Sequence, residues 1–143
     1  MKVAINGFGR IGKLALRAFI EKKPNKIDVV AINELGSLDS SIHLLKYDST
    51  HKILNSDITK TKKGIKVDKF NINFYSEKDP GKLPWKKLNV DVVLECSGAF
   101  TSKDKSYAHI NAGAKKVLIS APAENADATI VQGVNNHILK KNH

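Results

Sequence analysis

Apolar residues along the chain alternate between two patterns, one typical of buried strands and one typical of amphipathic helices. Residues 2–5 contain a short apolar run, Val3 to Ile5, that stops at Asn6, and residues 27–32 form a second run in which only Asp28 is polar. Between them, apolar residues recur at helical spacing over residues 11–22, ahead of Pro24. Continuous apolar runs predict strands that are buried on both faces, and the spacing between the runs predicts a helix.

The middle of the chain interrupts this rhythm before it returns. Residues 57–74 show short alternating runs with Gly64 at an expected turn, which predicts antiparallel or mixed strands. Pro80, Gly81 and Pro84 predict a loop around Trp85. Three further helices are predicted: a short one capped by Ser37 or Asp39, one capped by Thr101 or Ser102 that runs to about Asn111 with Gly113 just beyond it, and a last one within residues 135–141. Three further strands are predicted: a buried one over residues 90–95, one over residues 116–120 and a short one at Thr129–Val131.

This order of elements predicts an α/β fold. Strands that alternate with helices form a mostly parallel, doubly wound sheet with helices on both faces, and residues 57–74 would add a small antiparallel or mixed insertion. The sequence contains no internal repeat, low-complexity tract or linker, so residues 1–143 are expected to form one domain.

A glycine pattern lies at the junction of the first strand and the first helix. Gly7, Gly9 and Gly12 make the spacing G-x-G-x-x-G, and Glu34 follows about 20 residues later at the end of the second strand. In a Rossmann-type fold the first glycine permits a tight turn, the second lets a diphosphate approach the backbone, and the third lets the helix pack on the sheet. The N-terminus of the helix attracts a diphosphate, and Arg10 adds positive charge. A carboxylate at Glu34 accepts hydrogen bonds from ribose hydroxyls and repels a 2′-phosphate, which favours NAD over NADP.

Ligands of open α/β sheets bind outside the carboxyl ends of the strands, at the point where the strand order reverses. In this sequence those ends carry Asn6, Glu34, Ser97-Gly98 and Ser120. The alternative interpretation is a glycine-rich turn without any ligand, which the combination of strand, helix, second strand and carboxylate disfavours.

The chain has 143 residues and a net charge of +10, which raises the question of nucleic-acid binding. Arg10 and Arg17 are the only arginines, whereas base readout and bidentate phosphate contacts favour arginine. The lysines stand in small separate groups with few aromatic residues between them. We therefore interpret the lysines as a solvated surface, which makes a nucleic-acid partner improbable.

The other candidate chemistry is sparse. Cys96 is the only cysteine, which excludes an internal disulfide, and its place at the end of a buried strand favours a structural, unreactive thiol. The five histidines make no i, i+4 pair and no cluster with cysteine, so no metal site is expected. No apolar run approaches the ~20 residues of a membrane span, and the N-terminus does not resemble a signal peptide. We expect a soluble cytoplasmic protein with no membrane partner.

Much of the chain resembles the phosphorylating glyceraldehyde-3-phosphate dehydrogenases. The resemblance is carried by four segments in the family's order, residues 2–18, 29–36, 43–51 and 83–135. The resemblance covers the N-terminal, NAD-binding half of that family. The family's nucleophilic cysteine, catalytic histidine and substrate phosphate sites lie in its other half. The resemblance therefore implies an excised or truncated domain that has no catalytic residue and that binds NAD without catalysing a reaction.

The resemblance also implies roles for individual residues. Arg10 and Ile11 would face the diphosphate, Glu34 the adenosine ribose, and Ser120 the nicotinamide end. Lys78 stands where many bacterial members have arginine near the adenine, so it keeps the charge but loses planar stacking. The cofactor-binding residues expected on all these grounds are Asn6, Gly7, Phe8, Gly9, Arg10, Ile11, Gly12, Asn33, Glu34, Lys78, Ser97, Gly98, Phe100 and Ser120.

For the intact family enzyme the resemblance implies a homotetramer that oxidises an aldehyde phosphate. A thiolate attacks the aldehyde, hydride passes to NAD, and inorganic phosphate releases the acyl phosphate from the thioester. Three alternative functions stay open. The first is an erythrose-4-phosphate dehydrogenase, which Glu34 slightly favours, the second is a stand-alone dinucleotide-binding module, and the third is a lysine-rich nucleic-acid binder.

Overall fold

A seven-stranded sheet runs through the centre of the molecule. The computed structural model describes all residues from 1 to 143. The strand order is β5-β6-β7-β2-β1-β8-β9. The strands of this sheet are β1 (Lys2–Asn6), β2 (Asp28–Asn33), β5 (Ile58–Lys60), β6 (Gly64–Val67), β7 (Phe70–Tyr75), β8 (Val92–Glu95) and β9 (Lys116–Ile119). The pairs β7-β2, β2-β1, β1-β8 and β8-β9 are parallel, whereas β5-β6 and β6-β7 are antiparallel. The predicted mostly parallel sheet with an antiparallel insertion is therefore confirmed.

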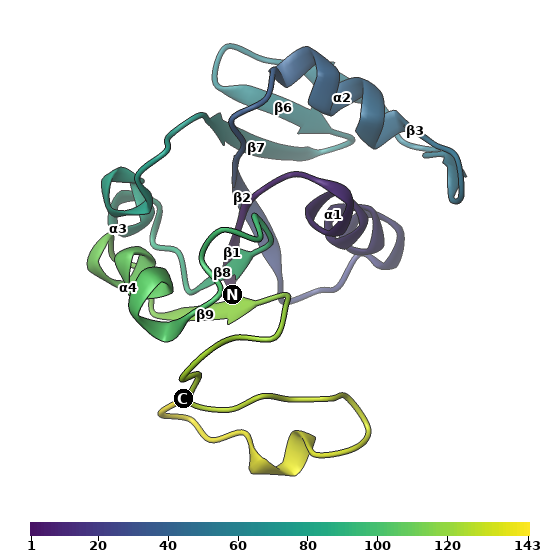
Figure 1. Cartoon of the computed structure of the whole chain (residues 1–143). Helices are drawn as coiled ribbons and strands as arrows, with labels where there is room; N and C mark the ends of the chain where they lie inside the picture. Colours follow the sequence, from purple (N-terminus) through teal and green to yellow (C-terminus); the bar gives the residue numbers. More distant parts are fainter.

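Helices cover both faces of the sheet, as Figure 1 shows with α1 on one side and α3 and α4 on the other. The helices are α1 (Arg10–Lys22), α2 (Leu38–Lys46), α3 (Trp85–Leu88) and α4 (Lys103–Asn111). Successive side chains of a strand point to opposite faces, so Ile5 packs in a core with Leu16 of α1 and Leu45 of α2, while Ala4 packs in a second core with Trp85 of α3. The doubly wound architecture follows from these two cores.

The predicted helix starts are close to those observed. The side chain of Ser37 accepts a hydrogen bond from the backbone N–H of Ser40 and caps α2, and Ser102 caps α4 by accepting from Lys105. The structure thereby chooses between the two cap residues that the sequence left open for each helix. Helix α1 ends at Lys22, and the next residue, Lys23, adopts a left-handed conformation with φ +44° just before Pro24.

One expectation in the middle of the chain is wrong and another is confirmed. The segment around Trp85 is not a loop, because a short 3-10 helix at Pro80–Lys82 leads into α3 and buries the indole completely. Gly64 does lie at a turn: its carbonyl oxygen accepts from the backbone N–H of Thr61 and closes the β5–β6 hairpin, and Gly64 is also the first residue of β6. A Cβ at Gly64 would lie 2.2 Å from the carbonyl oxygen of Ile72, so the glycine permits a close approach of two strands.

A hairpin of β3 (Tyr47–Asp48) and β4 (Lys52–Ile53) is not among the elements predicted from the sequence, and two expectations for the C-terminal segment are wrong. No strand forms at Thr129–Val131, and the expected last helix is only a 3-10 turn at Asn136–Ile138. Figure 1 shows that the chain after β9 extends away from the sheet. Val134 and Leu139 are exposed there, so the apolar residues have no core surface to stabilise regular structure.

Candidate dinucleotide site

The carboxyl ends of the three central strands meet at one edge of the sheet. Asn6 ends β1, Asn33 ends β2 and Glu95 ends β8, and the parallel register places Asn6 opposite both of the others. Strand β1 runs between β2, which follows it in the chain, and β8, which belongs to the other half of the sheet. The strand order therefore reverses beside β1, at the position where ligands of such sheets bind.

The turn at Gly7–Gly9 and the first residues of α1 pass over this edge, and two of the three glycines there are needed for packing. Gly7 has φ +88°, and a Cβ on it would lie 2.5 Å from the backbone nitrogen of Ser97. A Cβ on Gly12 would lie 2.2 Å from the carbonyl oxygen of Gly7. The loop after β1 and the loop after β8 are thus in direct backbone contact, and helix α1 packs tightly beneath them.

Gly9 differs from the other two glycines because a Cβ on it would meet nothing within 4 Å. It is the N-cap of α1, where no side chain caps the helix, and the first turn carries no acidic residue. The first N–H groups of α1 are therefore available to an external acceptor beside an open patch of backbone. Backbone donors at a helix N-terminus fit the diphosphate of a dinucleotide.

The carboxylate of Glu34 reaches from the end of β2 to this loop. Its Oε2 accepts a hydrogen bond of 2.6 Å from the backbone N–H of Phe8, and its Oε1 accepts one of 3.0 Å from Gly36. Each carboxylate oxygen can accept two hydrogen bonds, so the half-buried side chain keeps acceptor capacity for a ligand.

The other predicted residues differ in how they face the edge. Phe8 is buried in the hydrophobic core, so only its backbone faces the loop, whereas Ile11 is exposed. The exposed Arg10 donates a hydrogen bond to the hydroxyl of Thr50, and Lys78 lies exposed in the loop after β7. Phe100 lies half-buried with its ring edge-on to His109.

The loop after β8 and the end of β9 complete the edge. Ser97, Gly98 and Ser120 are exposed there, and Ser120 donates its backbone N–H to the carbonyl oxygen of Glu95. Cys96 is half-buried, and burial raises the pKa of its thiol, although a hydrogen bond with Ser120 acts in the opposite direction. A thiol of this kind is a weak nucleophile at neutral pH.

A buried hydrogen-bond network beneath the edge escaped the sequence analysis. In the sequence, Glu95 is only the last residue of the strand expected over residues 90–95, and His109 is one of five histidines that form no i, i+4 pair. In the structure Glu95 accepts hydrogen bonds from Asn6 Nδ2 at 2.6 Å, from the backbone N–H and the hydroxyl of Ser97, and from His109 Nε2 at 2.8 Å. Burial acts to raise the pKa of Glu95, but the hydrogen bonds from His109, Ser97 and Asn6 outweigh it and lower the pKa. A glutamate at the end of a buried strand was the one sequence signal that pointed to such a network.

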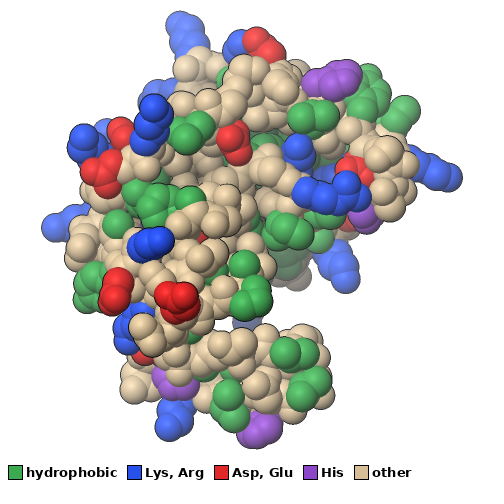
Figure 2. Space-filling model, in the orientation of Figure 1, with side chains coloured by type: hydrophobic (Ala, Val, Ile, Leu, Met, Phe, Trp, Pro, Cys, Tyr) green, Lys and Arg blue, Asp and Glu red, His purple; other side chains and the backbone are tan.

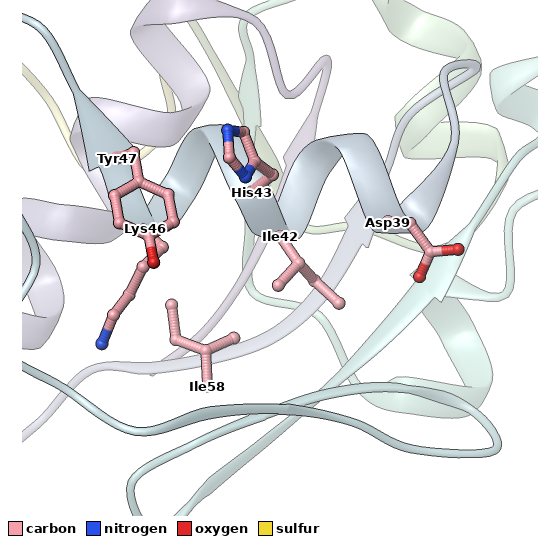
Figure 3. Close-up of a pocket in the computed structure, with 6 residues that line it drawn as sticks. All are labelled: Asp39, Ile42, His43, Lys46, Tyr47 and Ile58. Atoms are coloured by element: carbon pink, nitrogen blue, oxygen red, sulfur yellow. The ribbon is translucent and has the colours of Figure 1, made fainter.

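Other features of the surface lie away from this edge. A hollow of ≈ 320 Å³ lies between α2 and β5 and is drawn in Figure 3. None of the predicted cofactor residues lines it; its lining residues are Asp39, Ile42, His43, Lys46, Tyr47 and Ile58.

No group of three or more His, Cys, Asp or Glu side chains is placed to hold a metal ion. None of the helices has both the length and the apolar character that crossing a bilayer requires. On the face in Figure 2, the Lys and Arg side chains stand in separate groups among acidic and hydrophobic ones.

Comparison with known proteins gives a family for this arrangement. Residues 1–103 match the family model described as "Glyceraldehyde 3-phosphate dehydrogenase, NAD binding domain". The chain belongs to this family. The resemblance predicted from the sequence is confirmed, as are the NAD-binding function of the domain and NAD as its cofactor.

The curated relatives of this family member carry one name. The chain is 48% identical over 143 residues to glyceraldehyde-3-phosphate dehydrogenase of Xanthobacter flavus, covering 100% of this chain and 43% of the relative. It is 49% identical over 142 residues to the enzyme of Thermotoga maritima, with 99% and 43% covered. It is 51% identical over 138 residues to that of Clostridium pasteurianum, with 96% and 41% covered. The chain therefore spans well under half the length of these relatives.

Proposed function

We propose that NAD binds across the carboxyl ends of β1, β2 and β8, with its diphosphate at the N-terminus of α1. The observation that supports this placement best is the uncapped first turn of α1 beside the open backbone at Gly9. Arg10 and Ile11 follow directly and are exposed at the same helix end, where Arg10 adds positive charge. The predicted cofactor residues on β2, on β8 and in the loops after β7 and β9 then surround the sugars and rings.

In this arrangement Glu34 selects the cofactor. Its two oxygens are held by the N–H groups of Phe8 and Gly36, so the carboxylate is fixed in place. A fixed carboxylate accepts hydrogen bonds from the ribose hydroxyls of NAD and repels the 2′-phosphate of NADP. Repulsion of about 1–2 kcal/mol at a partly solvated site corresponds to a preference of roughly tenfold for NAD.

For the whole protein we propose the phosphorylating oxidation of an aldehyde phosphate, in keeping with the name glyceraldehyde-3-phosphate dehydrogenase that its relatives carry. The aldehyde carbon loses a hydride to NAD, and inorganic phosphate takes the place of that hydrogen on the carbonyl carbon, giving an acyl phosphate. Residues 1–143 supply the cofactor-binding part, and we expect them to bind NAD without oxidising an aldehyde by themselves. A cytoplasmic homotetramer follows from the same family resemblance.

Calorimetric titration of the purified chain with NAD and with NADP tests this function. We expect the unsubstituted chain to bind NAD at least about tenfold more tightly than NADP. The Glu34→Gln variant keeps the size of the side chain and removes its charge, so the ratio of the affinities for NAD and NADP should fall. Glu21→Gln is the matched control, because this exposed glutamate in the last turn of α1 loses the same charge far from the site.

Three results would contradict the proposal. Absence of NAD binding at millimolar ligand would show that the proposed NAD site is wrong. Equal affinities of the unsubstituted chain for NAD and NADP would show that Glu34 does not select between the two cofactors. Reduction of NAD by the chain with an aldehyde and phosphate would show that residues 1–143 contain catalytic groups of their own.

A further inference from the structure

A continuous chain of buried side chains crosses the molecule directly beneath the proposed cofactor edge. It begins on β2, crosses the ends of β1 and β8, and continues to α4 and α3. Its members are Asn33, Asn6, Glu95, His109 and Trp85, and each is at most 4% exposed. Neighbouring members are joined by hydrogen bonds of 2.6–2.9 Å.

The hydrogen-bond donors in this chain assign the proton on His109. The indole N–H of Trp85 can only donate, and it lies 2.9 Å from Nδ1 of His109. Nδ1 must therefore accept and carries no proton, so the proton of the neutral ring is on Nε2. Nε2 lies 2.8 Å from Oε2 of Glu95 and donates to it.

From the other side the donors also point towards Glu95. Asn33 Nδ2 donates to Oδ1 of Asn6, and Asn6 Nδ2 donates to Oε2 of Glu95. The backbone N–H and the hydroxyl of Ser97 donate to Oε1. Four donors thus converge on one carboxylate that has no lysine or arginine partner, and this number of donors stabilises its ionised form.

Glu95 connects the two loops that border the cofactor edge. Through Asn6 it fixes the end of β1 immediately before Gly7, and through Ser97 it fixes the loop after β8. Gly7 and Ser97 are themselves in backbone contact, since a Cβ on Gly7 would lie 2.5 Å from Ser97. A change at Glu95 therefore alters the spacing between the loops without removing any group that faces the cofactor.

We propose that Glu95 is a positioning residue for NAD: a buried carboxylate, held by neutral His109 and through it by Trp85, that sets the separation of the Gly7 and Ser97 loops. This inference rests on the proposed function for its consequence, but not for its geometry. The simpler alternative is that the network only stabilises the fold. The two differ in what a folded variant does, because a purely structural role leaves the affinity for NAD unchanged.

The tautomer of His109 provides a test without any ligand. The groups that face His109 are Glu95 from β8, Trp85 from α3 and Phe100 from the loop before α4, and Glu95 is the charged one. Nitrogen-15 NMR of the unsubstituted chain should show a proton on Nε2 of His109 and none on Nδ1. A proton on Nδ1 would overturn the assignment.

The effect on the cofactor is tested with Glu95→Gln. A glutamine places an NH₂ group against donors, so at least one contact to Asn6, Ser97 or His109 is lost and the loops shift. We expect the affinity for NAD to fall by about tenfold, because shifted loops lose hydrogen bonds to the cofactor and each lost bond weakens binding by up to about tenfold. Thermal unfolding of the same sample shows whether the variant is folded at the temperature of the titration, and Glu21→Gln is again the charge-matched control.

Trp85→Phe is the second variant and lies outside the cofactor edge. It keeps an aromatic ring in the core and removes only the indole donor, so Nδ1 of His109 loses its hydrogen-bond partner while Nε2 still donates to Glu95. We expect the nitrogen-15 shift of Nδ1 to change while the proton stays on Nε2, and a smaller loss of NAD affinity than in Glu95→Gln. If Glu95→Gln does not fold, Trp85→Phe and the unsubstituted chain still decide the proposal.

The outcomes separate this inference from the proposed function. If the unsubstituted chain binds no NAD, the proposed function fails, and the spectrum of His109 still tests the network. If the unsubstituted chain binds NAD and the folded Glu95→Gln variant binds it equally well, the positioning role is wrong and the proposed function stands.

Discussion

The close approach of the loops after β1 and β8 makes Gly7→Ala the most informative single substitution in the fold. Gly7 has φ +88°, and its added Cβ would lie 2.5 Å from both the nitrogen and the Cα of Ser97 and 2.7 Å from the carbonyl carbon of Cys96. All three atoms belong to the backbone, and ordinary contacts of a Cβ begin at 3.4 Å. The loops must therefore separate by roughly 1 Å, against the hydrogen bonds that tie Ser97 to Glu95.

The cost can be worked out from two contributions. A left-handed conformation costs an L-residue about 1–2 kcal/mol, and forcing an extra methyl group into a packed site costs about 1–3 kcal/mol. Alanine recovers about 0.4–1 kcal/mol by restricting the unfolded chain. The net loss of unfolding free energy is about 3 kcal/mol, which lowers the melting temperature of a domain of this size by roughly 6–12 °C.

Gly9→Ala is the matched control two residues further along the same loop. Gly9 has φ −72°, and its added Cβ meets nothing within 4 Å, so the unfolding free energy should change by less than about 1 kcal/mol. The new methyl group would stand where we propose that the diphosphate approaches, so NAD should bind at least about tenfold more weakly. Urea denaturation and calorimetric titration of both variants measure the two effects. Equal stability of Gly7→Ala and Gly9→Ala would refute the close approach of the two loops.

Two further predictions concern titratable groups. The pKa of Asp48 is lowered to about 2, chiefly by the hydrogen bond from the backbone N–H of His51, so its stabilisation of the β3-β4 turn is present above its ordinary value near 3.8 and is lost as the pH falls through about 2. The NMR shifts of the amides of Thr50 and His51 should follow that lower midpoint, and a midpoint near 4 would show that these hydrogen bonds are absent. Burial raises the pKa of Cys96, so iodoacetamide should alkylate the folded chain more slowly at pH 8 than the urea-unfolded chain, and equal rates would contradict the burial.

Local patterns in the sequence predicted most of the sheet and three of the four helices. A run such as residues 27–32 has enough apolar residues to specify a buried strand whatever it pairs with, and the spacing over residues 11–22 specifies a helix with one apolar face. The glycine spacing and Glu34 also identified one edge of the sheet, since parallel strands connected by helices bring their carboxyl ends to the same side.

Errors arose where packing against a distant segment decides the structure. Trp85 forms a helical turn because its indole fits a second core with Ala4, Val93 and Ala114, which no neighbouring residue reveals. The segment after β9 has apolar residues at suitable positions, but they lie on no surface that would stabilise a strand or helix.

The sequence by itself determined the type of fold, the glycine loop between β1 and α1 and the residues at the strand ends, because each depends on spacing within a few residues or on the rule for parallel connections. Only the tertiary structure decided the partners of Glu95. Asn6 is 89 residues away in the chain and His109 is 14 residues away, and Trp85 meets His109 across 24 residues. Such contacts arise when separately specified elements pack together, and a buried carboxylate obtains its charge state from the donors that this packing brings to it.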